Sequence, residues 1–512
     1  FHLSLLMTAA FALKSVGYWL QSLRLVYSPR GVVFGASYTD IHAQLPAFKG
    51  LIVIAGLLAL VALANIRLRR TSLFWGLPAG LAVASFLAGS IYPNLVQQLS
   101  VRPNELTRER QFIIKNIEFT RKAFGLEKIV EKEFAALDTL TTRDMEDNRA
   151  TLENIRVWDW RPLKRTYSQL QEIRPYYNFN DVDIDRYKVG GRLRQVMLSA
   201  REMDHSQLPE QGKTWINQAL KYTHGYGLVV SPATEVSSEG LPYFWIKDIP
   251  PKSETELKVT RPEIYYGESK DDYVFVKARE KEFDYPLGDK NAETIYEGKG
   301  GVPVGPLFNR LAFALRFENY NLILSNYITS DSRVMIYRNI HDQVRRIAPF
   351  LTYDSDPYLV IADGRLVWVQ DAYTTTNAYP YSEPFVPRND EEARQTREPF
   401  WGQPAFNYVR NSVKVTIDAY DGTVSFYLFD SGDPMVRTYA AIFPGLFKPA
   451  SEMPQAVREH LRYPEDLFGV QARQYTSYHM LNPEVFYNKE DYWNIAEESQ
   501  TFAVGDGKRG TS

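Results

Sequence analysis

The chain has 512 residues, a net charge of −2 at pH 7 and a mean hydropathy of −0.32. Because a single hydrophobic core stops growing below this length, at least two structural regions are expected. The small net charge gives no broad basic surface for nucleic acid, and the absence of cysteine excludes disulfides, thiolate metal sites and cysteine nucleophiles.

Three apolar segments occupy the start of the chain, at residues 1 to about 20, 50–66 and 73–92. The second and third run for 17 and 20 residues without a charge, close to the length that crosses a hydrocarbon core. Buried helices of a soluble protein are the alternative, but they seldom lack charges over such lengths. We therefore expect a multi-pass membrane protein with about three spans here, the first one truncated because the chain opens with Phe1 inside an apolar stretch.

Arginines indicate the orientation of these spans. The connector RLRRTS between the second and third segments carries Arg67, Arg69 and Arg70, and short arginine-rich loops stay in the cytoplasm. The polar stretch 28–46 lies at the other end of the second segment, so it is expected to face outside. By the same alternation, everything after residue 92 is predicted to lie outside the cytoplasm, at the cell membrane.

Two later segments have helical spacing. Residues 103–124 form the first, which ends at Gly125, and residues 306–317 form the second. One face of the second carries four apolar residues: Phe308, Leu311, Ala312 and Leu315. A helix is thus expected to lead out of the membrane, and another to lie within the soluble part.

Strand-like runs lie between and after these helices. The pairs Asp363-Gly364 and Asp421-Gly422 separate such runs, a pattern typical of β-hairpins because both central residues must accept positive φ. These patterns predict a membrane α-helical part over residues 1–92, followed by a large α+β extracytoplasmic domain. That domain is divided into an α+β region over 93–330, a second α+β subdomain with both hairpins over 331–495, and a flexible tail over 496–512.

Several long strings carry a resemblance to a known family. They are VVFGASYTDIHAQLP, VRPNEL, YTHGYG, RPEIYYGE, EFDYPLG, IAPFLTYDSDPYLVIADGRLVWVQDAYTTT, SVKVTIDAYDGTVSFY, FPGLFKP and LRYPEDLF. Together they make the chain similar to the bacterial uncharacterised protein family numbered zero-one-eight-two in the UPF series, from about residue 28 to about residue 493.

What this resemblance implies is topology rather than chemistry. Proteins of that family are similar in having seven membrane spans followed by a large extracytoplasmic domain, which agrees with the orientation argued from the arginines. The resemblance also implies a fragment that lacks the earliest spans and the C-terminal portion. The family has no established reaction, so no activity is carried over.

Motifs whose spacing encodes a common mechanism are absent from the sequence. It contains no G-x-S-x-G nucleophile elbow and no H-E-x-x-H zinc helix, and EGKGGVPVG lacks the Gly-Lys-Ser/Thr ending of a phosphate-binding loop. Whether the protein is an enzyme is left open, with the balance against it.

The alternating acids Asp181, Asp183 and Asp185 would lie on one face of a strand, where three carboxylates could attract a calcium ion outside the cell. The pattern departs from an EF-hand loop, because Arg186 stands where glycine is needed and Arg192 where the bidentate glutamate should be. A solvated strand face is the favoured alternative. No other cofactor is predicted.

The loop YTHGYG, residues 222–227, is a candidate functional loop. His224 is a candidate catalytic residue there, and Tyr222 and Tyr226 are candidate binding residues that could add hydrogen bonds to a ligand. The favoured alternative is a helix C-terminus, in which Gly225 is the left-handed cap and His224 lies at the negative end of the helix dipole.

Two further places are candidates. His42 and Asp40 lie in the polar stretch at the outer membrane surface, where catalysis would need a partner such as His224, so a loop that docks the domain onto the membrane part is the favoured alternative. Asp371, beside Tyr373 and Thr374, is a candidate binding residue near the first hairpin.

Three functions remain open. The leading one is a non-catalytic envelope scaffold that binds partner proteins or envelope components, and the second is an envelope enzyme that acts on lipid-linked or cell-wall substrates. The third is a transport component, which the nearly charge-free spans do not favour. The expected partners are the lipid bilayer and membrane or envelope proteins, self-association included, but not nucleic acid.

Overall fold

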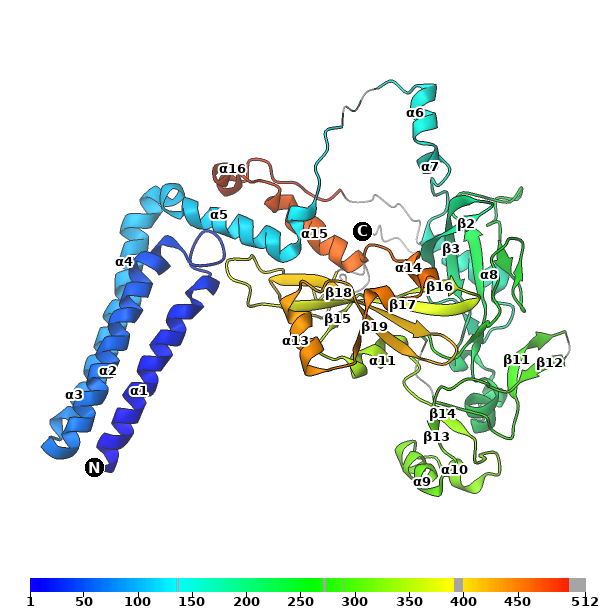
Figure 1. The fold of residues 1–512 in the computed structure, drawn as a ribbon, viewed down its shortest axis with the longest axis horizontal. Coiled ribbons are helices and arrows are strands. Elements are labelled where there is room, and N and C mark those ends of the chain that lie inside the picture. The colour runs from blue at the N-terminus through cyan, green and yellow to red at the C-terminus, as the bar shows by residue number, and fades with distance from the viewer. Residues whose placement is uncertain (135, 137, 270–272, 289, 391–398, 497–512) are drawn as a thin grey trace. The chain divides into compact units, whose positions relative to one another are not determined.

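The structure is a computed structural model that describes all residues except 135, 137, 270–272, 289, 391–398 and 497–512 (Figure 1). The predicted tail over residues 496–512 therefore lies, apart from its first residue, outside the described part. Contacts divide the chain into two compact units. The helical unit comprises residues 1–131, 375–410 and 465–512, and the sheet unit comprises residues 132–374 and 411–464.

Both units are built from discontinuous stretches of sequence, so the chain passes between them four times. The predicted boundaries at residues 92, 330 and 495 stay predictions, because a division by contacts does not test which parts fold on their own.

The helical unit begins with three long apolar helices that run side by side (Figure 1). They are α1 (His2–Leu23), α2 (Leu45–Leu68) and α3 (Ser72–Phe86). With their helical extensions, the stretches His2–Tyr27, Asp40–Leu68 and Ser72–Phe124 are long and apolar enough to cross a membrane. Small residues of α2, among them Ala55 and Ala59, are buried in one cluster with Phe11 and Tyr18 of α1, because small side chains let apolar helices approach closely.

The third apolar stretch continues through wide π-turns into α4 (Tyr92–Val96) and α5 (Glu105–Phe124). As expected from the sequence, α5 ends at Gly125 in the left-handed conformation. The unit also contains α15 (Glu465–Tyr478) and α16 (Pro483–Asn488). The polar side chain of Asn116 on α5 is buried within this unit. Its amide nitrogen donates hydrogen bonds to the carbonyls of Phe34 (3.1 Å) and Tyr381 (2.9 Å), and its amide oxygen accepts from the Tyr478 hydroxyl at 2.9 Å.

The sheet unit contains a five-stranded antiparallel sheet in the order β2, β3, β6, β7, β8. The strands are β2 (Asp183–Val189), β3 (Arg192–Ala200), β6 (Leu228–Pro232), β7 (Ile246–Lys247) and β8 (Lys252–Ser253). The helix α8 (Trp160–Gln171) contributes Leu163 and Tyr167 to a cluster with Met197 of β3 and Val229 of β6. One face of this sheet is thereby covered.

A second, six-stranded sheet has the order β15, β17, β18, β19, β20, with β16 also pairing with β17. The strands are β15 (Thr352–Tyr353), β16 (Tyr358–Ala362), β17 (Arg365–Thr376), β18 (Tyr408–Asp418), β19 (Val424–Leu428) and β20 (Phe447–Pro449). Apolar residues of both sheets share one core, in which Leu198 and Val230 join Ile361 and Trp368.

An antiparallel hairpin is present at each Asp-Gly pair, but the two loops differ. Asp363 and Gly364 both have positive φ, and Ala362 pairs directly with Arg365, as a two-residue turn requires. In the second hairpin Ile417 pairs with Val424, so the loop is longer, and only Gly422 has positive φ.

Shorter elements complete the sheet unit. The helices are α6 (Thr142–Asp147), α7 (Arg149–Leu152), α9 (Leu307–Arg316), α10 (Asn321–Leu324), α11 (Ile340–Ile347), α13 (Pro434–Ile442) and α14 (Gln455–Arg458). The strands are β1 (Tyr177–Asn178), β4 (Glu202–Met203), β5 (Gly225–Tyr226), β9 (Glu263–Ile264), β10 (Val274–Val276), β11 (Glu282–Leu287), β12 (Lys290–Thr294), β13 (Val302–Pro303) and β14 (Arg333–Met335).

The structure thus has three long apolar helices followed by an α+β region. This confirms the helical and α+β parts of the predicted fold class.

Candidate functional site

His224 is completely buried in the sheet unit, just before β5, and two carboxylates hold it. Its Nε2 lies 3.4 Å from Asp284 Oδ1, and its Nδ1 lies 2.8 Å from Thr223 Oγ1 and 3.7 Å from Glu282 Oε2. Because the Thr223 hydroxyl donates to Glu282 at 2.6 Å, we assign Nδ1 as the donor to that hydroxyl. The ring of His224 packs on Tyr265, with the centroids 4.6 Å apart.

The charge balance around His224 favours the imidazolium. Burial lowers its pKa, but the hydrogen bonds and charges of Asp284 and Glu282 outweigh that effect, so the pKa of His224 is raised above its ordinary value. Glu282 is fixed in turn, because it accepts hydrogen bonds from the Tyr265 hydroxyl at 2.7 Å and the Tyr296 backbone N–H at 3.0 Å. The group is a closed acid–histidine network rather than an exposed catalytic pair.

The neighbouring tyrosines contribute rings and backbone groups. The Tyr222 carbonyl is 2.6 Å from His205 Nε2, and its ring packs against Phe283. The Tyr226 carbonyl accepts from Arg201 at 3.0 Å, and its ring packs against Tyr285. These contacts involve the carbonyls and rings rather than the hydroxyls, so the predicted binding roles of Tyr222 and Tyr226 stay predictions.

The helix-cap interpretation of Gly225 was wrong. Gly225 lies in β5 and pairs with Ile264, and the left-handed glycine of the loop is Gly227 instead, with φ +70°. Glycine is required at 225 for a different reason: an added Cβ would lie 2.4 Å from the Arg201 carbonyl oxygen. A close approach of two backbones, not a helix end, explains this residue.

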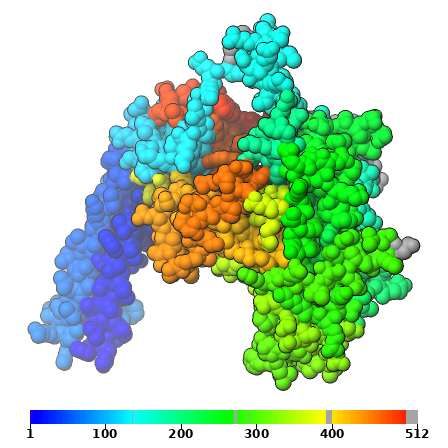
Figure 2. Space-filling view, turned by 45° about the vertical axis from the view of Figure 1, so that its right-hand side comes forward, coloured from blue at the N-terminus to red at the C-terminus, as the bar shows by residue number. Residues whose placement is uncertain are grey.

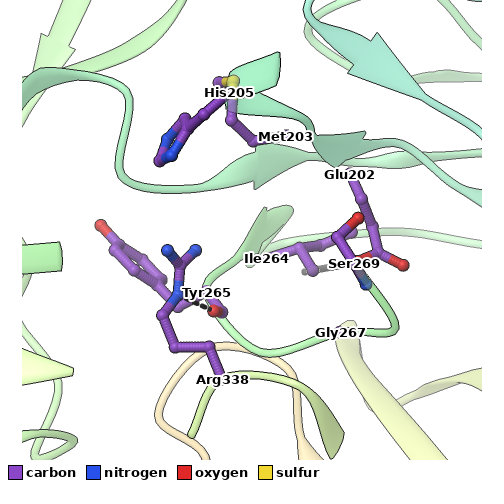
Figure 3. A pocket seen from close by; sticks show the side chains of 8 residues that line it. All are labelled: Glu202, Met203, His205, Ile264, Tyr265, Gly267, Ser269 and Arg338. Carbon is purple, nitrogen blue, oxygen red and sulfur yellow. Dashed lines mark hydrogen bonds between the residues drawn. The ribbon is translucent and has the colours of Figure 1, made fainter. Parts of the chain in front are cut away.

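A small pocket lies beside Tyr265 (Figure 3). Its lining residues are Glu202, Met203, His205, Ile264, Tyr265, Gly267, Ser269 and Arg338. Arg338 closes one side by donating to the carbonyls of Tyr265 and Thr223, each at 2.7 Å. The cavity measures about 20 Å³, which is room for about one water molecule and not for a substrate.

Asp371 lies on β17 and is buried in an ion pair with Lys414 of β18. The Asn411 side chain also donates to it, at 3.0 Å. Burial raises the pKa of Asp371 despite the opposing effect of Lys414. Its neighbour Thr374 donates to Asp433 at 2.5 Å, so this group is linked within the protein.

The three alternating aspartates have different hydrogen-bond and ion-pair partners. Asp183 accepts from the Leu359 N–H at 3.0 Å, and Asp185 pairs with His460 Nδ1 at 2.8 Å, while Asp181 accepts from the adjacent Val182 N–H. Within the described ranges, no group of three or more histidine or acidic side chains is arranged to hold a metal ion. Asp183 and Asp185 are both buried, so the solvated strand face that we favoured was wrong, and the calcium site stays a prediction.

His42 and Asp40 belong to the helical unit and have different partners. His42 is exposed, stacks on Tyr38 with centroids 4.0 Å apart, and has Nδ1 3.1 Å from the Tyr38 carbonyl. Asp40 is buried, accepts from the Ser37 N–H at 3.0 Å and hydroxyl at 2.8 Å, and pairs with Arg30 at 3.3 Å. The predicted catalytic roles of His42, Asp40 and His224 stay predictions.

Sequence reasoning missed an exposed apolar surface at α9 and α10. We name it the α9–α10 surface, and its residues are Leu307, Phe308, Leu311, Leu315, Tyr320, Ile323 and Leu324. Phe308, Leu315 and Leu324 are 79, 78 and 80% exposed. Figure 2 shows this yellow-green segment at the lower end of the sheet unit. The predicted apolar face of α9 is therefore turned outward, while the smaller Ala314 packs inward with Leu322.

The partners of His224 were also missed. Glu282 and Asp284 alternate on β11, 58 and 60 residues further along the chain than His224, so no local spacing connects them with it. The sequence does contain a weak signal, because both YTHGYG and EFDYPLG belong to the strings that carry the family resemblance.

Comparison with known proteins identifies relatives over nearly the whole chain. The model of the family described as "Uncharacterised protein family (UPF0182)" matches residues 1–505. A UPF0182 protein of Desulforamulus reducens is 51% identical over 499 residues, which are 97% of this chain and 52% of that protein. Similar proteins of Pelotomaculum thermopropionicum and Moorella thermoacetica are 51% and 50% identical, over 97% and 99% of this chain and 53% and 54% of their own lengths. The chain thus spans about half the length of these curated relatives. No solved structure matches the chain.

Proposed function

Because the chain belongs to the uncharacterised UPF0182 family, whose description names no activity, we propose a function from the geometry described above. The protein is an integral cell-membrane protein whose large α+β part lies outside the cytoplasm. There it acts as a non-catalytic envelope scaffold that binds a partner protein through the α9–α10 surface.

The α9–α10 surface is the observation that carries this proposal. Monomeric soluble proteins seldom expose contiguous apolar patches, and larger ones mark interaction sites. Seven large apolar side chains are exposed within 18 consecutive residues, from Leu307 to Leu324. A partner that covers them would remove apolar area from water, which is the main favourable contribution to most protein associations.

The state of the polar candidates supports a non-catalytic role. His224 is enclosed by Thr223, Asp284 and Glu282, and the adjacent pocket has room for about one water. Asp371 is engaged by Lys414 and Asn411. Side chains that are already paired within the protein are suited to stabilising the fold, whereas a catalytic site also needs space for the reacting atom of a substrate.

Charge distribution supports the proposed orientation. The loop between α2 and α3 carries Arg67, Arg69 and Arg70, and positively charged short loops are retained in the cytoplasm. The opposite end of α2 is joined to the stretch 28–44, which belongs with α5 to the helical unit. Residues beyond α3 would then lie on the outer side.

Photo-crosslinking tests the partner surface. A benzoyl-phenylalanine placed at Phe308 in the whole protein, in intact cells, is expected to form a discrete protein adduct. Leu315→Glu in the same chain should reduce that adduct about tenfold, because it places a charge at the centre of the apolar contact. Leu193→Glu, at a leucine that is 53% exposed on β3, is the matched control and should leave the adduct unchanged.

Two results would contradict this proposal. An adduct of equal yield in the Leu315→Glu chain would mean that the apolar surface does not make the contact. Adducts formed only with lipid would assign the surface to the bilayer instead of a protein.

A further inference from the structure

An open cavity of about 390 Å³, lined by both polar and apolar side chains, lies beside the apolar helices of the helical unit. Its walls come from α1, from the polar stretch that follows, from the beginning of α2 and from the end of the third apolar stretch. The lining residues that matter here are Lys14, Tyr18, Arg30, Asp40, Gln44 and Ser85. Such a concentration of polar groups is unexpected beside helices of this composition.

Lys14 is the first observation that points to a ligand. It lies inside the stretch His2–Tyr27, nine residues before the end of α1, or about 13 Å along the helix axis. Its ammonium group contacts the ring of Tyr18 at 5.1 Å, and no described carboxylate lies within 4 Å of it. Ionisable residues at such depth are rare and usually face a polar cavity in which they have a function.

Arg30 supplies a second cation at the same cavity. Its guanidinium lies 3.3 Å from Asp40 and donates to Gln44 at 3.1 Å, which fixes its position. The Arg30 side chain remains 32% exposed, so its fork retains an open side. With Lys14 and Arg30 positive and Asp40 negative, the lining has a net charge of +1.

The backbone around the cavity is also unusual. Two π-turns contribute to its wall, Asp40–Gln44 through Asp40 and Gln44, and Leu87–Ile91 through Gly89 and Ser90. Single π-turns within helices occur frequently at functional sites, because the extra residue redirects side chains. Here they place polar groups where an uninterrupted apolar helix would continue.

We propose that this cavity binds the phosphate group of an anionic phospholipid of the outer leaflet. Lys14 and the open side of Arg30 bind the phosphate oxygens, while the Tyr18 and Ser85 side chains, which are hydrogen-bonded to each other, form part of the wall. Phe48 and Leu51 also line the cavity, so apolar surface is available for the glycerol and upper acyl carbons. Basic pockets between membrane helices on the cytoplasmic side bind lipid head groups by this chemistry, and we propose the same chemistry at the outer leaflet.

The inference rests on the membrane placement proposed above. A soluble phosphate would satisfy the same cations, whereas the apolar part of the wall and the position beside the helices favour a lipid. The two sources differ in one measurable respect: a lipid is retained only with its acyl chains, and inorganic phosphate needs none.

The test uses the whole protein in nanodiscs that contain equal amounts of phosphatidylglycerol and phosphatidylcholine. Native mass spectrometry measures the ratio of the two lipids retained by the protein. We expect the wild-type protein to retain more phosphatidylglycerol than phosphatidylcholine. Lys14→Gln should reduce this enrichment about fivefold, which is the contribution of one basic residue to binding at a lipid surface. Lys14→Arg should preserve the enrichment, because it keeps the charge. Lys49→Gln is the control, because Lys49 is an exposed lysine near the beginning of α2 that does not line the cavity.

A parallel measurement of inorganic phosphate binding in phosphatidylcholine nanodiscs distinguishes the sources. Phosphatidylglycerol enrichment without phosphate binding supports the lipid, and saturable phosphate binding that Lys14→Gln abolishes assigns the site to a soluble anion instead. Equal lipid ratios for wild type, Lys14→Gln and Lys49→Gln would overturn the site. Failure of the protein to enter nanodiscs at all would instead contradict the membrane placement, so the two failures are distinguishable.

Discussion

At His224, burial and charge act in opposite directions on a single side chain. The imidazole is completely buried, which favours its neutral form, yet Asp284 and Glu282 raise its pKa. A pKa that is raised in the folded state means that the folded protein binds the proton more tightly than the unfolded chain does. This stabilisation is fully present below the ordinary histidine pKa and is lost as the pH rises through the raised value.

His224→Gln should therefore flatten part of the stability profile. Between slightly acidic and alkaline pH, the free energy of unfolding of the wild type is expected to fall by up to about 1.4 kcal/mol per pH unit through this residue, and that component should disappear in the variant. Guanidinium unfolding of the whole protein in detergent, repeated across pH, measures it. His42→Gln, at an exposed histidine, is the control. A profile unchanged by His224→Gln would mean that the carboxylates do not hold a proton on the ring.

The Asp371–Lys414 pair predicts a strong coupling between two residues. Removal of one partner leaves an uncompensated buried charge, so Asp371→Asn and Lys414→Met should each destabilise the protein by about 3–5 kcal/mol. The double variant should lose much less than the sum, because neither charge remains. Denaturant unfolding of the four proteins of this cycle gives the coupling energy. Additive losses would show that the pair does not interact as described.

At the scale of an element, the turn of the second hairpin is constrained both by its backbone conformation and by a neighbouring side chain. Gly422 has φ +70°, and an added Cβ would lie 2.4 Å from the Tyr266 ring. Gly240 has a similar φ of +75°, but no atom lies within 4 Å of an added Cβ. Comparison of the two glycines therefore separates the cost of a left-handed backbone from the cost of crowding by neighbouring atoms.

Gly240→Ala should destabilise the protein by about 1 kcal/mol, the cost of a left-handed alanine. Gly422→Ala should cost about 2–4 kcal/mol, since Tyr266 must also move. Thermal unfolding of both variants in parallel measures the difference. Equal losses of stability in the two variants would mean that the ring of Tyr266 moves away from the added methyl group at no cost in free energy.

The same elements show which features of a sequence can be predicted. The Asp363-Gly364 turn and the end of α5 at Gly125 follow from local backbone chemistry, so short patterns were sufficient. The amphipathic spacing of residues 306–317 predicted a helix but not the outward direction of its apolar face, because spacing does not identify what covers a face. The partners of His224 were invisible for a related reason: tertiary contacts over 58 and 60 residues leave no periodic pattern.

For the whole molecule, the absence of cysteine makes the proposed orientation easy to test. Single cysteines can be introduced at Ser238, exposed in the sheet unit, and at Thr71, exposed in the arginine-rich loop. In spheroplasts, a membrane-impermeant maleimide should label Ser238→Cys directly and Thr71→Cys only after permeabilisation. The reverse pattern would place the α+β part in the cytoplasm.

The division into two discontinuous units has a consequence for synthesis. The amide oxygen of Asn116 on α5 receives its hydrogen bond from Tyr478, which is 362 residues later in the chain. At roughly 5–20 residues per second, the ribosome would take about 20–70 s to produce that partner. Until residue 478 has been made, α5 lacks this partner for its buried Asn116, so the packing of the helical unit is completed only late in synthesis.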